Sequence, residues 1–547
     1  MLSEVAALSY HEPTTSTTLI LAAFALILNF ANHAFDRLLS CGLLIQVLVG
    51  AAFGIPGAKW LDESTQQFVV QAGYLGLILL VYEGGLSASI PLLRQNLLLC
   101  VAVAATGILL PMGLSFTLQP LMGATALQAF AAGAALCSTS LGTTFTVLTS
   151  SNLTQSKLGV VLSGAAMMDD VVGLVLVQVI ANLGSSTGTG GRTRFDPISI
   201  VRPVAASLGL AIFAPLVCRF VALPLAGALS DIRSRPVDGI ISRTSKRRET
   251  AFVVQTLVLY GCVAAAGYAG ASVLLAAYLA GACISWWDDN MYTFSAASAG
   301  SLAEIAKVDT SGHAIYIHFY HQVVSKFLCP FFFASIGFAI PLRLMFTGPV
   351  LWRGIVYSVL MVLGKVACGV WLIRLPTRLR VPQRADAVAP AAVPPTEERS
   401  NTASINHSQP ACETTAKKPD AVHATADTAA SRRSRSLYPA VILGCAMVAR
   451  GEIGFLVSAL AASKGIFGRP SIDAGGEPTS ANIESDIFLV VTWAIVICTM
   501  VGPIAVGIMV RRVRWLEATK AANSIDGSVN VLGEWGIGVG VHRDQES

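Results

Sequence analysis

Charged side chains are scarce in this sequence. Of its 547 residues, 13% are Asp, Glu, Lys or Arg and 54% are hydrophobic, whereas roughly 25% of the residues in soluble domains are charged. The apolar residues gather in runs of about 20, the length of helix that crosses the ~30 Å hydrocarbon layer of a bilayer. The composition therefore argues against a soluble multidomain protein and predicts a multi-pass integral membrane protein.

Paired cysteines and clustered positive charge are also missing. All of the 11 cysteines except Cys412 lie in apolar runs, and none has the paired spacing of a zinc site or a redox motif. We therefore expect no resident metal and no cofactor. The formal net charge of +5 is carried by loops between apolar runs, which favours membrane lipid over nucleic acid as the partner. The opening residues lack the basic region of a cleaved signal peptide.

The apolar runs predict an all-α polytopic membrane protein with about 13 transmembrane helices. Lys and Arg concentrate in alternate loops, including the stretch from Arg233 to Arg248, and the positive-inside rule then places the N-terminus outside and the C-terminus in the cytosol. The acidic 287–321 loop does not support this orientation. The runs lie near 18–36, 40–56, 66–86, 97–119, 126–148, 157–183, 199–227, 251–269, 270–286, 322–343, 350–374, 437–462 and 485–511.

One long insert divides the membrane part. Residues 375–436 are rich in Ala, Pro, Thr and Ser and cannot bury a core, so we expect a disordered cytosolic tether, with a regulatory phosphorylation or lipid-binding segment as the alternative. The predicted organisation is a short tail (1–17), spans one to eleven (18–374), the insert (375–436), spans twelve and thirteen (437–511) and a cytosolic tail (512–547).

Two adjacent carboxylates stand in span six. Asp169 and Asp170 lie in "GAAMMDDVVGLVLVQVI", which is otherwise apolar, although each charged side chain at the bilayer centre costs at least ~2.5–3.5 kcal/mol on insertion scales. Lys365 lies in the middle of span eleven, too far from either end to snorkel easily. A carboxylate partner is the better explanation for this lysine.

Two spans carry interruptions at corresponding places in the two halves of the chain. Span five contains Thr139 and Ser140 beside glycine in "LCSTSLGTT", and span twelve contains Arg450 and Glu452 in "VARGEIGFL". Inverted five-helix repeats with two crossed, interrupted helices are typical of secondary transporters with a site near the midplane. We expect Arg450 and Glu452 to neutralise the opposed helix dipoles at this crossing rather than to bind the ion.

The motifs "MMDDVVGLVL", "LCSTSLGTT", "VLGKVACGV" and "VARGEIGFL" resemble the second branch of the monovalent cation:proton antiporter superfamily, which includes sodium/proton exchangers. The resemblance implies that Asp170 carries ion and proton, that Asp169 is a second acid paired with Lys365, and that Thr139 and Ser140 lie beside the ion. It also implies a homodimer in which spans one to three and eight to ten form a scaffold and the other core spans move as an elevator.

The predicted function is secondary active exchange of Na⁺ or Li⁺ for H⁺, electrogenic, with no enzymatic activity. A K⁺/H⁺ exchanger of an internal membrane is the alternative, and the sequence leaves open whether the membrane is the plasma membrane or an organelle membrane. An intramembrane aspartyl protease is more remote, because neighbouring residues on one helix project about 100° apart rather than face each other. A channel is disfavoured because no filter-like repeat is present.

Overall fold

The computed structural model describes residues 12, 14–39, 42–88, 96–140, 156–185, 198–222, 224, 248–296, 311–374, 437–467, 480–523, 531–532 and 535. All regular secondary structure in these ranges is helical, which confirms the predicted all-α class. Eight helical segments are long and apolar enough to cross a membrane. They fall in α1 (Thr15–Leu39), α3 (Glu63–Leu86), α5 (Leu97–Ser115), α9 (Lys157–Ser185), α10 (Ile198–Val217), α13 (Arg248–Ala269), α20 (Gly348–Val366) and α24 (Ser480–Asn523).

Other helices complete the remaining predicted spans. Three of them are short and apolar: α2 (Gly42–Phe53), α7 (Ala126–Cys137) and α23 (Glu452–Ser463). The others include α14 (Val273–Ala296), α16 (Gly312–Phe319), α17 (His321–Val323), the π-helical turn η2 (Val324–Leu328), α18 (Cys329–Gly337), α19 (Leu342–Met345), the 3₁₀ turn η3 (Ala367–Gly369), α21 (Val370–Arg374) and α22 (Tyr438–Ala446). The insert 375–436 lies outside the described residues.

Hydrogen bonds of the local sequence fix the first residues of two helices, α14 and α16. Between α13 and α14 the chain turns through Gly270, whose φ of 73° is accessible to glycine, and the Ser272 hydroxyl caps α14 by accepting from the Leu275 amide at 3.3 Å. The tenth span begins earlier than predicted, at Gly312 rather than 322; Ser311 caps the first turn of α16, and Asp288 Oδ2 of α14 accepts from the Gly312 amide at 2.6 Å.

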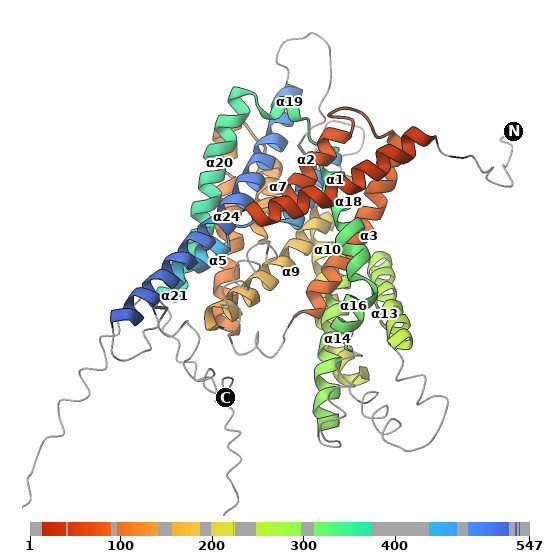
Figure 1. The fold of residues 1–547 in the computed structure, drawn as a ribbon, viewed down its shortest axis with the longest axis vertical. Helices are drawn as coiled ribbons and strands as arrows, with labels where there is room; N and C mark the ends of the chain where they lie inside the picture. Colours follow the sequence, from red (N-terminus) through yellow and green to blue (C-terminus); the bar gives the residue numbers. More distant parts are fainter. Residues whose placement is uncertain are drawn as a thin grey trace, which may run out of the picture.

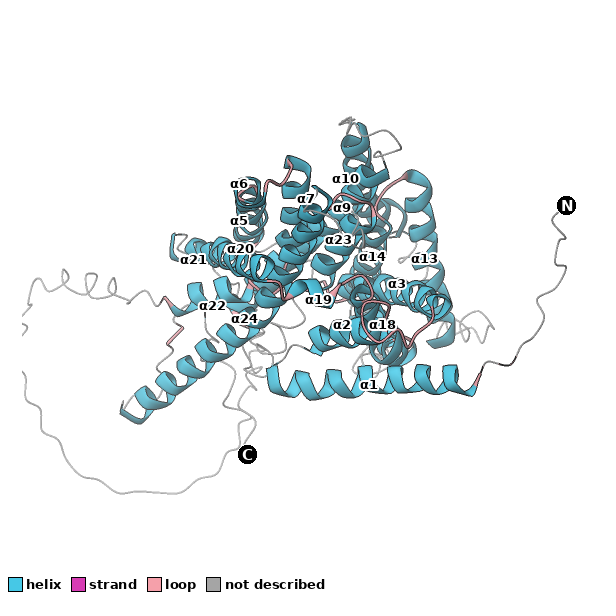
Figure 2. Ribbon diagram, turned by 90° about the horizontal axis from the view of Figure 1, so that it is seen from above, coloured by secondary structure: helices cyan, strands magenta, loops and turns pink. Residues whose placement is uncertain are grey.

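The helices form two bundles that lie side by side (Figures 1 and 2). We call the first the α3 bundle; it contains α1, α2, α3, α13, α14 and α16–α18, with α3 packed against α14 and α18. The second, the α9 bundle, contains α5, α7, α9 and α20–α24, with α23 packed against α7 and α9. Helix α10 contacts both α9 and α14 and so connects the two bundles.

Close backbone contacts hold each bundle together internally. A Cβ on Gly85 of α3 would lie 3.1 Å from the Ala282 amide nitrogen of α14, and one on Gly281 of α14 would lie 2.8 Å from the Leu86 nitrogen of α3. Only glycine permits these helices to approach so closely. Similar close approaches occur within the α9 bundle, where a Cβ on Gly444 would lie 2.6 Å from the Val366 carbonyl oxygen.

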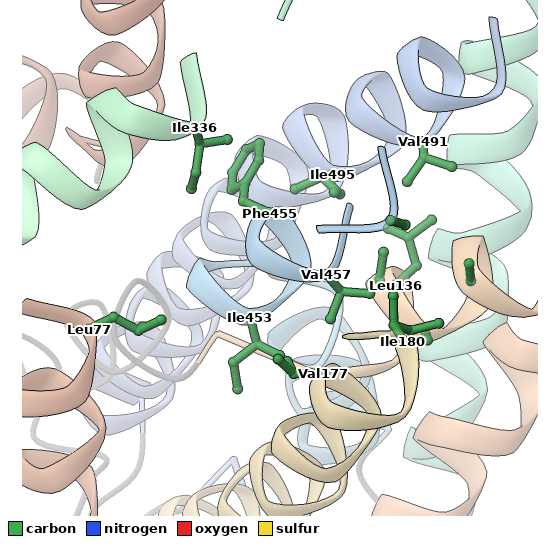
Figure 3. Packing of buried hydrophobic residues seen from close by; sticks show 14 of the residues in the cluster. Leu77, Leu136, Val177, Ile180, Ile336, Ile453, Phe455, Val457, Val491 and Ile495 are labelled. Carbon is green, nitrogen blue, oxygen red and sulfur yellow. The ribbon is translucent and has the colours of Figure 1, made fainter. Parts of the chain in front are cut away.

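The boundary between the bundles is built instead from apolar side chains. Helix α23 packs against α7, α9 and α24, and its Phe455 faces Ile336 of α18 across the boundary (Figure 3). One hydrogen bond that crosses the boundary is donated by the Ser272 hydroxyl of the α14 cap to the Leu174 carbonyl of α9, at 2.9 Å. Two helix surfaces that meet through apolar side chains can slide past each other more easily than two helices whose backbones are in close contact.

Candidate ion-binding site

Two broken helices cross inside the α9 bundle. Helix α7 ends at Cys137 and continues as extended backbone through Ser138, while residues 447–451 separate α22 from α23. At the crossing the Ser140 amide donates to the Ala449 carbonyl at 2.9 Å. A Cβ on Gly451 would lie 2.5 Å from the Ser140 side chain, so only glycine fits there. Both interruptions therefore occur where the sequence predicts them, although the part of "LCSTSLGTT" after Ser140 lies outside the described residues.

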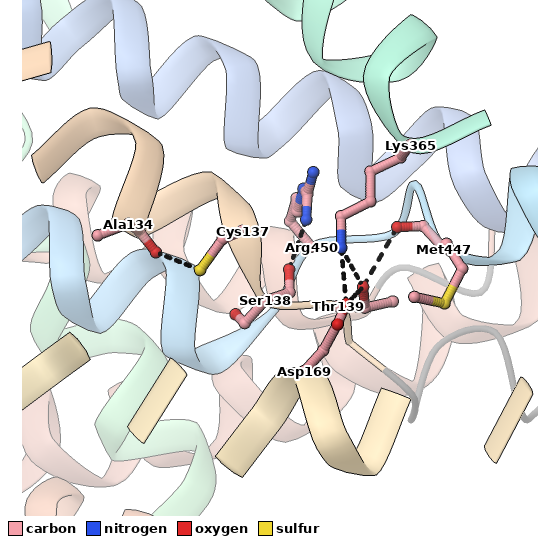
Figure 4. A network of polar contacts seen from close by, with 8 residues as sticks. All are labelled: Ala134, Cys137, Ser138, Thr139, Asp169, Lys365, Met447 and Arg450. Atoms are coloured by element: carbon pink, nitrogen blue, oxygen red, sulfur yellow. Dashed lines mark hydrogen bonds and ion pairs between the residues drawn. The ribbon is translucent and has the colours of Figure 1, made fainter. Parts of the chain in front are cut away.

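An ion pair is buried directly beside this crossing. Lys365 Nζ lies 2.7 Å from Asp169 Oδ2, and both side chains are 0% exposed. Thr139 bridges the pair, because its hydroxyl donates to Asp169 Oδ2 at 2.8 Å and accepts from Lys365 Nζ at 2.8 Å (Figure 4). The structure thus brings together three of the residues singled out in the sequence, from α9, α20 and the broken end of α7.

The second carboxylate oxygen of Asp169 takes no part in the ion pair. Asp169 Oδ1 is buried and has no hydrogen-bond partner among the described residues. An unsatisfied buried carboxylate oxygen is costly unless a proton or a ligand occupies it in part of the working cycle.

Asp170 is placed differently from its neighbour. It is only partly buried on α9, and its side chain makes no hydrogen bond or ion pair with another described residue. Glu452 and Asp169 act on it electrostatically as like charges, and Lys365 acts on it as an opposite charge. The two adjacent carboxylates thus occupy distinct environments: Asp169 is enclosed and paired with Lys365, whereas Asp170 is partly buried and forms no ion pair with another described residue.

Arg450 and Glu452 lie at the ends of the broken helices. The Arg450 guanidinium is fully buried, and its Nη1 donates to the Ser138 carbonyl, the C-cap of α7, at 2.6 Å (Figure 4). Glu452 is the first residue of α23, where it interacts with the Ser140 hydroxyl and its own amide. A cation thus lies at the negative end of one half-helix and an anion at the positive end of the other, as charge compensation requires.

Sequence reasoning did not single out two neighbours of the ion pair. Cys368 lies about one helical turn after Lys365, and this spacing indicates that the two side chains are neighbours. Gly107 of α5 approaches both members of the pair, and nothing in the surrounding apolar sequence indicates this contact.

Residues 19–397 match the model of a family described as sodium/hydrogen exchanger, transmembrane. The high-affinity Na⁺/H⁺ antiporter NhaS3 of Synechocystis is 35% identical over 143 residues, which are 26% of this chain and 31% of that protein. A Na⁺/H⁺ antiporter of Enterococcus hirae is 23% identical over 319 residues, 58% of this chain and 72% of that one. The sodium proton antiporter MjNhaP1 of Methanocaldococcus jannaschii has a similar fold, with a TM-score of 0.53, 12% identity, and coverage of 91% of this chain and 99% of that chain.

Proposed function

The chain belongs to the sodium/hydrogen exchanger family, and on that premise we propose that it is a secondary active antiporter that exchanges Na⁺ or Li⁺ for H⁺. The observation that carries this proposal is the contrast between the adjacent carboxylates of α9. Asp169 is enclosed with Lys365 at 2.7 Å, while Asp170 has no partner among the described residues.

Asp170 is the proposed carrier. A carboxylate that is partly withdrawn from water resists carrying a bare charge, and either a proton or a metal cation can neutralise it. Because both ligands need the same oxygens, binding of one displaces the other. Hard oxygen donors suit Na⁺ and Li⁺, and they also admit K⁺.

Lys365 and Asp169 form the proposed switch. Breaking this pair by removing one partner's charge is expensive in a dehydrated site, so a proton on Asp169 and release of Lys365 should occur together. Thr139 contacts both groups and can follow the exchange by rotating its hydroxyl. Two proton-carrying sites for one monovalent cation would move one net charge per cycle, and the antiport would be electrogenic.

Alternating access is proposed to occur by movement of the α9 bundle against the α3 bundle. Two features support an elevator motion: glycine contacts interlock helices within each bundle, and apolar side chains form the boundary between bundles. The site residues all belong to the α9 bundle and would travel together. We also expect a homodimer in the lipid bilayer, with the α3 bundles as the stationary scaffold.

The test is flux through the purified protein in proteoliposomes that contain a pH-sensitive dye. Inward gradients of Na⁺ or Li⁺ should drive proton efflux, and a matched K⁺ gradient should drive little. A response to K⁺ alone would favour the K⁺/H⁺ exchanger, and no response to any of the three cations would contradict antiport. Chemical cross-linking of the same vesicles would test the dimer.

A further inference from the structure

Helix α5 passes the buried ion pair at Gly107. A Cβ at this position would lie 3.2 Å from Lys365 Nζ, 3.3 Å from Cys368 Sγ and 3.4 Å from Asp169 Oδ2. All three of these side chains are fully enclosed. The backbone of α5 at Gly107 therefore lies directly against the ion pair, and any side chain there would press on the pair.

Helix α5 cannot easily retreat from the pair. Trp371 of α21 donates through Nε1 to the Thr106 hydroxyl at 2.7 Å, so the residue next to Gly107 is tied to the segment that follows Lys365. One and a half to two turns earlier, the Cys100 thiol reaches the Val161 carbonyl of α9 at 3.7 Å. With α5 anchored to both neighbours, an added methyl group must be accommodated by Lys365, Cys368 or Asp169 themselves.

We propose that Gly107 is a positioning residue for exchange: its missing side chain leaves Lys365 Nζ the freedom to move off Asp169 and return. The inference rests on the proposed antiport. A methyl group at this position hinders release of the lysine and keeps the carboxylate paired. A proton must then compete with the trapped ammonium group for Asp169, so exchange slows and requires a more acidic medium.

The test compares Gly107→Ala with Gly113→Ala, a matched change on the same helix where a Cβ meets nothing within 4 Å. In proteoliposomes, Gly107→Ala should reduce the maximal rate by about tenfold or more, since small displacements of reacting groups have effects of that size. The pH of half-maximal exchange should also move to lower values. Gly113→Ala should match the wild type in both respects. Equal rates and pH profiles for the two variants would overturn the proposal.

Cys368→Ala provides an independent variant should Gly107→Ala fold poorly. Removing the thiol enlarges the same space from its other side, so the pH of half-maximal exchange should move upward, opposite to the effect of Gly107→Ala. An unchanged pH profile in Cys368→Ala would contradict the inference. Absence of cation-driven proton flux in the wild type would instead contradict the proposed function, so the two failures are distinguishable.

Discussion

Among the described residues, every fully buried charged side chain belongs to the α9 bundle, whereas the charged side chains of the α3 bundle stay partly exposed. Glu83 and His321, 3.7 Å apart, keep 27% and 49% of their side chains exposed. Lys365, Asp169 and Arg450 are 0% exposed. Because a buried ion pair contributes little net stability and is often neutral relative to apolar packing, the charges of the α9 bundle are better explained by transport than by folding.

The two bundles also differ in the continuity of their helices. Helices α3 and α14 of the α3 bundle run without interruption and interlock through Gly85 and Gly281. The α9 bundle breaks two helices at its centre and joins them by the bond from Ser140 to Ala449. Close glycine contacts occur in both bundles, so the α9 bundle is set apart by its two broken helices and by the buried charged side chains beside them.

The largest expected difference concerns Lys365. Lys365→Ala leaves the Asp169 carboxylate buried without its partner, a change that destabilises proteins by ~3–5 kcal/mol when the remaining charge is retained. On a solid-supported membrane, the wild type should give a sustained current that depends on the cation, and Lys365→Ala should lose it. Lys464→Ala, at an exposed lysine of the same bundle, should behave as the wild type. If Lys365→Ala gave the same current as the wild type, Lys365 would not be part of the proposed switch.

Substitutions at glycine contacts of the α3 bundle should change the stability of the protein but not the pH dependence of exchange. Gly85→Ala places a Cβ 3.0 Å from the Tyr278 carbonyl carbon, whereas a Cβ on Gly84 meets nothing within 4 Å. Overpacking of this kind costs ~1–3 kcal/mol, so Gly85→Ala should lower the unfolding temperature in detergent and Gly84→Ala should not. Neither change should move the pH profile of exchange. A shifted pH profile of exchange in folded Gly85→Ala would contradict the assignment of pH-dependent exchange to the α9 bundle alone.

The smallest effect is expected at the boundary. Glycine is a tolerable helix N-cap, so Ser272→Gly keeps α14 capped but removes the hydrogen bond to Leu174 of α9. If the bundles shift here, loss of a bond worth ~0.5–1.5 kcal/mol should raise the maximal exchange rate about two- to tenfold. Ser272→Thr, which retains the hydroxyl, is the control. Identical rates in all three proteins would indicate that this contact persists throughout the cycle.

Much of this arrangement follows from the sequence. The apolar runs predict the helices, hydroxyl and glycine residues mark both breaks, and the improbable position of Lys365 predicts a carboxylate partner. Periodicity along one chain cannot show which residues of distant helices meet, however. For that reason Thr139 and Ser140 could not be told apart, although Thr139 bridges the ion pair and Ser140 joins the crossing. The approach of Gly107 depends on how α5 is anchored and is equally invisible in the sequence.

Proton flux through Asp170→Asn in proteoliposomes tests the central claim most directly. An amide cannot alternate between protonated and cation-binding forms, and at this partly buried position the substitution leaves no hydrogen bond to another described residue broken. We predict that Asp170→Asn shows no Na⁺- or Li⁺-driven dye response while its elution profile and unfolding temperature match the wild type. Near-normal cation-driven proton flux in this variant would contradict the assignment of Asp170 as the carrier.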